Sequence, residues 1–421
     1  MDRPAHAVIS RRQFARFAAG GSFAAFAGLA RASSFPAIKR VLDDAVSAHN
    51  APGYSVFVGR GDSSWICASG WQDLSSRTPM RPDTIFRIAS ITKPVVAAAA
   101  MLLVDDGKIA LHDPVDRWIP ELANRQVVRS ISGPIDDCVP ARRRITLHDL
   151  LTLQMGLGAL IADPGECPLL RALIDRGIAP GPALFPGSSQ EFIDRLSALP
   201  LAYQPGQRWL YHTGMEVAGI LVSRVAGKPL SAFVAERLTG PLGMVDTAFF
   251  VPAEKRARLA TAYIRGENGR LSLDNRAPAL ARAPAMESGG SGLVSTARDF
   301  GQFGRMLLKD GYCRGRRILS ERSARLMRAD HLSPEVKAES PFFPGFWDTY
   351  GWGLGAAVST RPDQISGAGR FGWWGGTGTT FFIDPNSATA AVLLSQRMMT
   401  GPDDIAVSNS FLEAAFAGRL R

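Results

Sequence analysis

The sequence is poor in the residues that most often bind metal ions. Four of its 421 residues are cysteine and six are histidine. The cysteines, Cys67, Cys138, Cys167 and Cys313, lack the short spacings of metal ligands, and the histidines form no H-E-x-x-H pair. We therefore expect no metal site and no cofactor. Cys138 and Cys167 flank one segment and could form a disulfide in an oxidising compartment; four buried free thiols fit equally well.

The sequence also lacks the marks of several other classes of protein. Despite a formal net charge of +10, it has no basic block with interleaved aromatic residues, so we expect no nucleic-acid partner. The apolar run from Pro94 to Val104 has eleven residues, too few to span a bilayer. Residues 289–293 miss the final glycine of the G-x-S-x-G motif, and residues 351–355 do not complete a dinucleotide-binding fingerprint.

The N-terminus has the features of a targeting segment. Residues 10–14 read Ser-Arg-Arg-Gln-Phe, a mild apolar stretch follows from Phe17 to Ala30, and residues 30–32 read Ala-Arg-Ala. This pattern resembles a twin-arginine (Tat) export signal with cleavage after Ala32. It implies contact with the Tat export machinery before cleavage and a periplasmic or secreted mature protein. A surface amphipathic helix or a membrane anchor is the alternative, and we exclude residues 1–32 from the fold.

Both ends of the remaining chain indicate strands beside a helix. A helix is expected around residues 38–46, followed by strands near Tyr54–Val58 and Trp65–Ser69. Near the other end, Thr379–Ile383 and Thr389–Ser395 are rich in β-formers, and a last helix is expected from about residue 402 to 417. The middle of the chain has mostly helical periodicity.

The simplest architecture is an antiparallel sheet built from both chain ends, flanked by the terminal helices, with a mainly helical domain inserted between them. This is an α/β fold of the α+β type. We expect residues 33–89 plus 346–421 to form the sheet domain and residues 90–345 the helical domain. A cleft is expected where the two meet, covered by the Pro- and Gly-rich segments 121–144 and 158–207.

The most informative segment places a serine and a lysine three residues apart. Ser90 and Lys93 lie just ahead of the apolar run, so a helix that begins near Ser90 puts both on one face and carries Lys93 into the core. A neutral lysine near pH 7 needs a pKa about three units below its usual 10.4, on the order of 4 kcal/mol, which burial can supply. The alternative is a capping serine beside a solvated lysine.

Two further segments have features of a reaction site. Tyr211 precedes an expected helix around Val217, so its hydroxyl could project from a turn into the cleft; it could equally be an aromatic residue packed under a loop. Gly375 and Gly376 open the strand at Thr379, where glycines let backbone N–H groups approach a ligand closely. An ordinary β-bulge is the alternative there.

Taken together, these elements resemble the serine β-lactamase and penicillin-binding-protein family, most of all its class C β-lactamase and family VIII esterase branch. The resemblance extends through nearly the whole chain after the N-terminal segment. It is carried by residues 86–93, 145–152, 205–211, 289–296 and 350–355. It implies a β-lactamase/transpeptidase-like fold and the chemistry of a serine hydrolase.

The resemblance implies a role for each candidate residue. Ser90 would attack a carbonyl carbon and form an acyl-enzyme. Lys93 and Tyr211 would share the proton and return it to the leaving group. The backbone N–H groups of Ser90 and Thr377 would hold the oxyanion, with Gly375 nearby. Water would then release the acyl group.

Two departures from the family pattern bear on the substrate. Thr213 stands where β-lactamases usually have asparagine, and Trp374-Gly375-Gly376 replaces the usual K-T-G. The missing lysine ordinarily helps to hold the carboxylate of a β-lactam, and an indole carries no charge. Trp374 also has a plain interpretation as a rim aromatic residue that packs the strand. We therefore expect cleavage of small, uncharged esters or amides.

Other functions of such a site stay open. A β-lactamase, an acyltransferase and a D-amino-acid peptidase or transpeptidase that acts on peptidoglycan stems use the same chemistry. A binding or sensor module that captures peptidoglycan fragments or β-lactams without turnover belongs to a different class. The expected partner in every case is a small ester, amide or β-lactam, and the sequence leaves the oligomeric state open.

Overall fold

A computed structural model describes residues 34–277 and 280–417 of the chain. The expected twin-arginine signal, residues 1–32, lies outside the described residues. Within the described ranges, no single helix is long and apolar enough to cross a membrane, although one bent pair, Thr213–Ala226 with Leu230–Leu242, reaches that length jointly.

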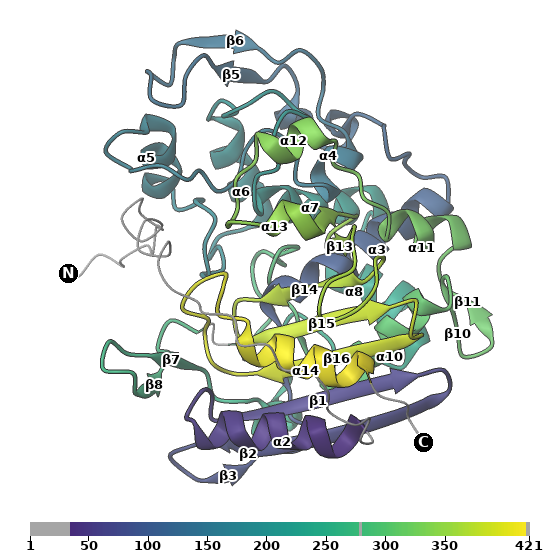
Figure 1. Cartoon of the computed structure of the whole chain (residues 1–421). Coiled ribbons are helices and arrows are strands. Elements are labelled where there is room, and N and C mark those ends of the chain that lie inside the picture. The colour runs from purple at the N-terminus through teal and green to yellow at the C-terminus, as the bar shows by residue number, and fades with distance from the viewer. Residues whose placement is uncertain (1–33, 278–279, 418–421) are drawn as a thin grey trace.

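An eight-stranded antiparallel sheet, built from both ends of the chain, forms the base of the molecule (Figure 1). In spatial order its strands are β12 (Tyr350–Trp352), β13 (Ala357–Ser359), β14 (Phe371–Gly375), β15 (Thr379–Asp384), β16 (Thr389–Ser395), β1 (Gly53–Arg60), β2 (Ser63–Asp73) and β3 (Thr78–Pro79). The two chain ends join where β1 pairs with β16, with Tyr54 opposite Ser395. The expected sheet from both ends is confirmed.

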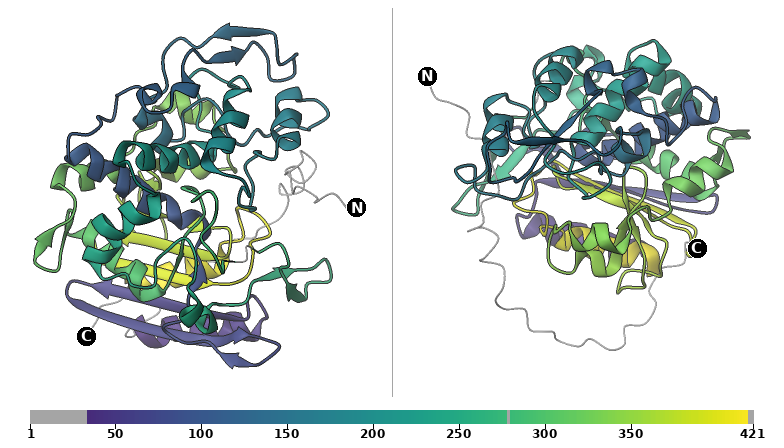
Figure 2. Two further views of the ribbon diagram at one scale, coloured as in Figure 1. Left: turned by 180° about the vertical axis from the view of Figure 1, so that it is seen from behind. Right: turned by 90° about the horizontal axis from the view of Figure 1, so that it is seen from above.

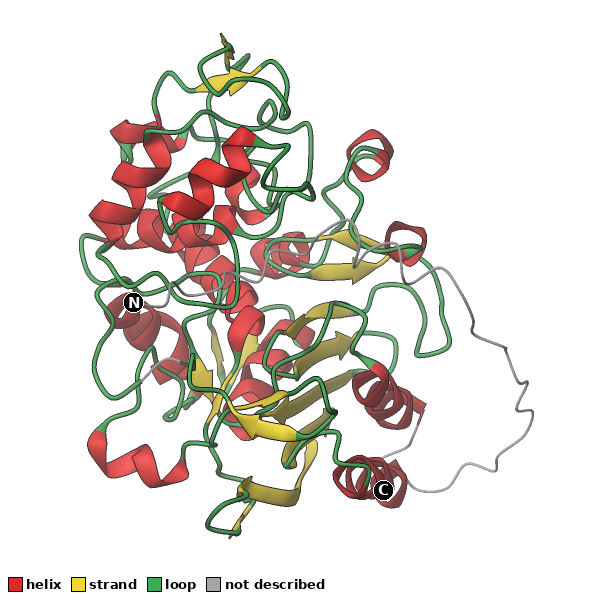
Figure 3. Cartoon of the chain, turned by 90° about the vertical axis from the view of Figure 1, so that its left-hand side faces the viewer, coloured by secondary structure: helices red, strands yellow, loops and turns green. Residues whose placement is uncertain are grey.

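Helices cover both faces of this sheet. The helices are α2 (Ser34–Ser47), α3 (Thr92–Asp105), α4 (Leu147–Leu151), α5 (Pro168–Asp175), α6 (Ser189–Ser197), α7 (Thr213–Ala226), α8 (Leu230–Val234), α9 (Gly240–Leu242), α10 (Ala297–Leu308), α11 (Glu321–Met327), α12 (Pro334–Ala338), α13 (Phe346–Thr349) and α14 (Ala406–Ala417). Helices α2 and α14 pack together on one face, and α10 packs on β1, β15 and β16 from the other (Figure 3). Seen from above, the strands lie between the helices of the middle of the chain and α14 (Figure 2).

Helix α3 is the centre of the helical part and packs against α7, α8 and α11. Every residue from Thr92 to Leu103 is buried, as its apolar sequence predicts for a core helix. One continuous cluster of buried apolar side chains extends from the sheet into α3 and α7. The sheet and the helical part therefore share a core, and a site at their junction has rigid walls.

Two-stranded sheets and short helical segments complete the fold. Three of these sheets are hairpins, β5 (Gln126–Val128) with β6 (Cys138–Pro140), β7 (Tyr263–Arg265) with β8 (Leu271–Leu273), and β10 (Tyr312–Cys313) with β11 (Arg316–Arg317), and the fourth pairs β4 (Phe86–Arg87) with the distant β9 (Val294–Ser295). The 3-10 helices are η2 (Ala89–Ile91), η3 (Val115–Arg117), η4 (Pro120–Leu122) and η6 (Ala253–Arg258), and η5 (Ala235–Thr239) is a π-helical segment.

The structure corrects two expectations and decides one alternative that the sequence left open. Segment 121–144 contains the β5–β6 hairpin, which lies at the outer end of the helical part, far from β14, so this segment does not cover the junction (Figure 1). Helix α14 begins at Ala406 because Asp404 binds Arg397, at 2.6 Å, and holds the preceding residues in a turn. All four cysteines are free thiols, so Cys138 and Cys167 form no disulfide.

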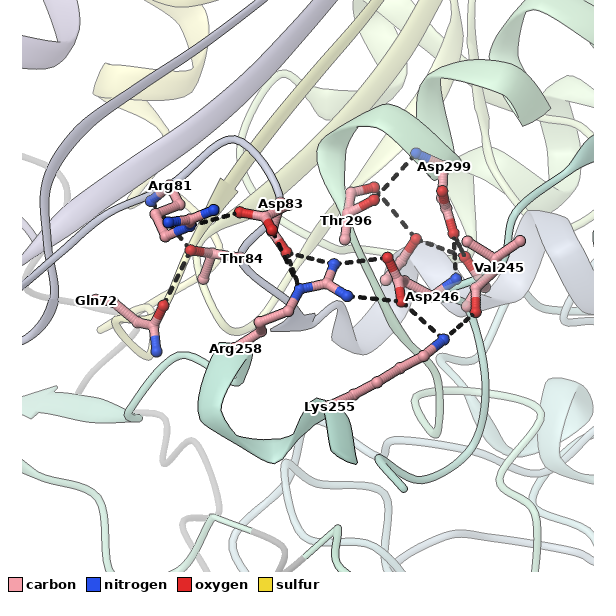
Figure 4. A network of polar contacts seen from close by, with 12 residues as sticks. Gln72, Arg81, Asp83, Thr84, Val245, Asp246, Lys255, Arg258, Thr296 and Asp299 are labelled. Atoms are coloured by element: carbon pink, nitrogen blue, oxygen red, sulfur yellow. Dashed lines mark hydrogen bonds and ion pairs between the residues drawn. The ribbon is translucent and has the colours of Figure 1, made fainter. Parts of the chain in front are cut away.

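A polar network holds the segment that leads into β4 and Ser90 (Figure 4). Arg258 of η6 donates to the backbone oxygen of Asp83 at 2.6 Å and to the carboxylate of Asp246 at 2.6 Å. Lys255 pairs with Asp246 at 2.9 Å, and the Asp246 N–H donates to Asp299 at 2.7 Å. The network joins three segments that are distant in the sequence, and it fixes the chain just upstream of Ser90.

Candidate active site

Ser90 and Lys93 are brought together as their spacing predicts. Ser90 lies in the single turn η2, and Lys93 lies in the first turn of α3. The Lys93 Nζ donates to Ser90 Oγ at 2.9 Å and to the backbone oxygen of Gly290 at 2.9 Å. The capping residue of α3 is Ile91, and no side chain caps this helix. The alternative of a serine cap beside a solvated lysine is therefore wrong.

The residue before Ser90 has an unusual backbone conformation. Ala89 has a φ of +44°, in the left-handed region that disfavours residues with a Cβ atom. Such a conformation costs about 1–2 kcal/mol per residue. Here it forms the sharp turn between β4 and α3 that presents the Ser90 side chain to Lys93.

Burial sets the charge of Lys93. Its side chain has 0% solvent exposure, and burial lowers its pKa from 10.5 to about 7, although the nearby Glu216 carboxyl partly opposes this change. A substantial fraction of Lys93 is therefore an uncharged amine at neutral pH. An uncharged amine can accept the proton of the hydroxyl to which it is hydrogen-bonded.

Tyr211 completes this group of side chains. It lies in the turn before α7, and the Lys93 Nζ is 4.4 Å from the centre of its ring. The Trp373 Nε1 donates to the Tyr211 hydroxyl at 2.8 Å. Burial raises the pKa of Tyr211 well above its usual value, although the interactions of this hydroxyl with Ser90 and Trp373 act to lower its pKa. The phenol therefore keeps its proton at neutral pH, and it can pass a proton along a chain from Ser90.

The glycine-rich turn between β14 and β15 packs directly on the segment of Ser90. The Thr377 Oγ1 donates to the backbone oxygen of Arg87 at 2.7 Å. A Cβ atom added to Gly375 would lie 2.5 Å from the Ile88 oxygen and 3.4 Å from the Ser90 nitrogen. Glycine is required at this position because the two backbones touch.

The side chain of β14 that reaches the site belongs to Trp373, not to Trp374. Trp373 contacts Tyr211, whereas Trp374 is 8% exposed and packs its ring on Phe382 at 4.8 Å and on Tyr350 at 5.8 Å. Successive side chains of a strand point to opposite faces of its sheet, so only one of the two neighbours can face Tyr211. Trp374 therefore has the packing role that was its alternative interpretation.

Gly376 and Thr213, the two remaining candidate site residues, lie in different surroundings. Gly376 lies in the turn, is partly exposed, and has room for a Cβ atom, whose nearest neighbour would be a sulfur 3.8 Å away. Thr213 is the first residue of α7 and is 3% exposed. Gly376 thus borders open space next to Gly375, while Thr213 is part of the helix start.

Two buried titratable residues beside this group were missed by the sequence reasoning. His212 follows Tyr211, and Glu216 lies one turn further along α7, with 3.7 Å between the His212 Nδ1 and the Glu216 Oε1. The i,i+4 spacing of histidine and glutamate next to Tyr211 was a signal that could have drawn attention to them. Their contact with Gly290 across the fold could not be read from the sequence.

The fold and the site define a serine hydrolase of the β-lactamase and penicillin-binding-protein type. The chain matches the family model described as β-lactamase over residues 38–414. This protein therefore belongs to the β-lactamase family, and the expected family, fold and enzyme class are confirmed.

Named relatives are similar over most of the chain. Protein Rv1367c of Mycobacterium tuberculosis is 41% identical over 333 residues, which cover 78% of this chain and 81% of that protein. Esterase EstB of Burkholderia gladioli is 30% identical over 396 residues, which cover 88% and 93%. Among solved structures, EstCE1, described as a hydrolase with promiscuous acyltransferase activity, matches with a TM-score of 0.75 and 25% identity over 91% of this chain and 98% of that one.

Proposed function

We propose that this protein is an exported serine hydrolase that cleaves small, uncharged esters or amides through an acyl-enzyme on Ser90. The observation that carries the proposal is the 2.9 Å hydrogen bond between Ser90 Oγ and the Nζ of a fully buried Lys93. This pairing puts a base within reach of a hydroxyl that is otherwise a weak nucleophile.

The mechanism assigns each group one task. As the Ser90 Oγ bonds to the substrate carbonyl carbon, its proton passes to Lys93, and the carbonyl electrons move to the oxygen. The N–H of Ser90 and an N–H of the turn at Gly376 and Thr377 stabilise that oxyanion. Tyr211 and Lys93 return the proton to the leaving group as its bond to carbon breaks. Water then attacks the acyl-enzyme, loses a proton to the same pair, and Ser90 regains its own.

Two features support an uncharged substrate. In β14, Trp374 stands where the family commonly carries a lysine that pairs with a carboxylate, and the side chain of β14 that reaches Tyr211 is the neutral indole of Trp373. The similarity to esterase EstB extends over 88% of this chain. An ester or amide without a carboxylate beside the scissile bond fits such a site better than a β-lactam does.

The test uses the purified protein without residues 1–32. p-Nitrophenyl butyrate should be hydrolysed, a fluorophosphonate probe should label the protein, and Ser90→Ala should abolish both. No turnover and no labelling, or labelling that survives Ser90→Ala, contradicts the proposal. Nitrocefin, a D-Ala-D-Ala peptide and an added alcohol acceptor separate the rival activities. An acyl adduct that stays bound for hours in a mass spectrum indicates a sensor.

Export is the second part of the proposal, and it rests on the pattern of residues 10–14 and 30–32. Expression of the full chain in a bacterial host should yield a periplasmic protein whose N-terminus is Ser33. Replacing Arg11 and Arg12 by lysine should leave it in the cytoplasm. A full-length, cytoplasmic product of the unmodified chain contradicts this part alone.

A further inference from the structure

His212 and Glu216 form a buried pair behind the catalytic candidates. Their side chains are 12% and 10% exposed. His212 directly precedes α7, and Glu216 lies in the first turn of this helix. The Ser288 hydroxyl donates to Glu216 Oε1 at 2.7 Å. Neither His212 nor Glu216 takes part in the proton transfers proposed for Ser90, Lys93 and Tyr211.

The hydrogen bonds of the pair are incomplete. Among the described residues, Glu216 Oε2 and His212 Nδ1 have no hydrogen-bond partner, and both atoms are shielded from solvent. A buried polar atom without a partner is costly, so such atoms call for an explanation in function or in proton binding. The nearer Glu216 oxygen, Oε1, lies 3.7 Å from the His212 Nδ1, so the two side chains are not hydrogen-bonded to each other.

Gly290 connects the pair to Lys93. The Gly290 backbone oxygen accepts a hydrogen bond from the Lys93 Nζ at 2.9 Å. A Cβ atom added to Gly290 would lie 2.5 Å from Glu216 Oε1 and 2.9 Å from His212 Nδ1. One peptide segment therefore touches the amine through its oxygen and the buried pair through its Cα. A side chain at Gly290 would break this arrangement.

The charges on these groups depend on one another. A charged Glu216 carboxylate raises the pKa of Lys93, and a charged Lys93 lowers the pKa of both Glu216 and His212. Burial acts in the opposite direction on Lys93 and Glu216, because it disfavours charge on either. The titratable groups that face one another here are Lys93 from α3 and Tyr211, His212 and Glu216 from the start of α7.

We propose that Glu216 is a positioning residue that sets the pH range over which Lys93 can accept the Ser90 proton. The inference rests on the proposed function of Ser90 and Lys93. In this arrangement the carboxylate stabilises the lysine ammonium that forms when Ser90 loses its proton. Gly290 fixes the distance over which this stabilisation acts.

The test compares pH profiles of kcat/KM on p-nitrophenyl butyrate for the wild type, Glu216→Gln and Glu216→Asp. Loss of the carboxylate lowers the pKa of Lys93, so Glu216→Gln should move the acid limb about one unit to lower pH and reduce kcat at least about tenfold. Glu216→Asp, which keeps the charge, should restore most of the wild-type profile. An unshifted Glu216→Gln profile in a folded protein overturns the inference.

A matched control is Asp384→Asn. Asp384 is also a buried carboxyl, but it accepts the backbone N–H of Asn386 at 3.1 Å in the turn between β15 and β16. This variant should keep the wild-type profile, and a shift as large as that of Glu216→Gln would mean that any buried carboxyl has this effect.

A second readout requires no turnover. In protein labelled with 13C-lysine, the Lys93 signal, assigned through its absence in Lys93→Met, is followed with pH. Its titration should move to lower pH in Glu216→Gln, and an unchanged midpoint overturns the inference. A wild type that cannot hydrolyse the ester contradicts the proposed function, while the spectrum still decides the role of Glu216.

Discussion

Replacing Lys93 by methionine should make the protein more stable while it destroys activity. The buried amine has a pKa of about 7 instead of 10.5, and at about 1.36 kcal/mol per pH unit this difference corresponds to on the order of 5 kcal/mol. This cost is fully present below pH 7, where Lys93 is charged in both the folded and the unfolded state, and it vanishes above pH 10.5, where both are neutral. The contribution of Lys93 to the free energy of unfolding therefore becomes more favourable as the pH rises from 7 to 10.5.

Methionine has a similar length and carries no charge, but Lys93→Met also loses the hydrogen bonds to Ser90 and Gly290, at about 1 kcal/mol each. The expected net gain at pH 6 is about 3 kcal/mol. At pH 9 the remaining cost in the wild type is about 2 kcal/mol, so the gain should fall to roughly zero. The acid–base role of Lys93 predicts a loss of about 10²- to 10⁴-fold in kcat.

The assay is urea unfolding of the wild type and Lys93→Met at pH 6, 7.5 and 9, followed by tryptophan fluorescence. The eight tryptophans give a strong signal. The pH dependence is the decisive part, because the lost hydrogen bonds contribute almost equally at each pH. A stability difference that stays constant from pH 6 to pH 9 would refute a lysine with a depressed pKa.

Two further substitutions test the surroundings of Ser90. Trp373→Phe keeps an aromatic ring but removes the N–H donor to Tyr211, so kcat/KM should fall about tenfold, with most of the loss in kcat. Trp374→Phe, its matched control, should change kcat/KM less than about twofold; equal losses in steady-state assays would contradict the assignment of the two tryptophans. Ala89→Gly relieves the positive φ and should raise the unfolding free energy by about 1 kcal/mol while kcat falls; a lower stability in thermal unfolding would argue against strain at this turn.

The pairing of Ser90 with Lys93 could be predicted because it is local. Two positions three residues apart at a helix start must lie on one face, and the apolar run after them fixes which face is buried. The terminal strands were predictable for the same reason, since their alternation and turn residues are local signals. A single sheet from both chain ends was the simplest architecture for these strands, but which strands of the two ends pair, β1 with β16, was not predicted.

The rest of the site depends on facts that a single sequence does not contain. Trp373 and Trp374 are adjacent residues of the same type, so the sequence does not reveal which of the two side chains faces Tyr211. The contact of Glu216 with Gly290 joins residues far apart in the chain, and its importance depends on burial. The β5–β6 hairpin was missed because its strands have three residues each, too short for a clear alternation.

The hydrogen bond from Thr377 to the Arg87 oxygen spans 290 positions of the chain. During synthesis, the segment of Ser90 leaves the ribosome long before the glycine turn that packs on it, and β16 must also arrive before β1 is enclosed on both sides. Helix α3 gains its neighbours α7 and α8 midway through translation, whereas the turn that packs on the segment of Ser90 is made only near the end, so the site is complete late in synthesis. For the same reason, hydrolysis by this protein is a direct reporter of complete folding, and truncated or nicked chains should be silent in the assay.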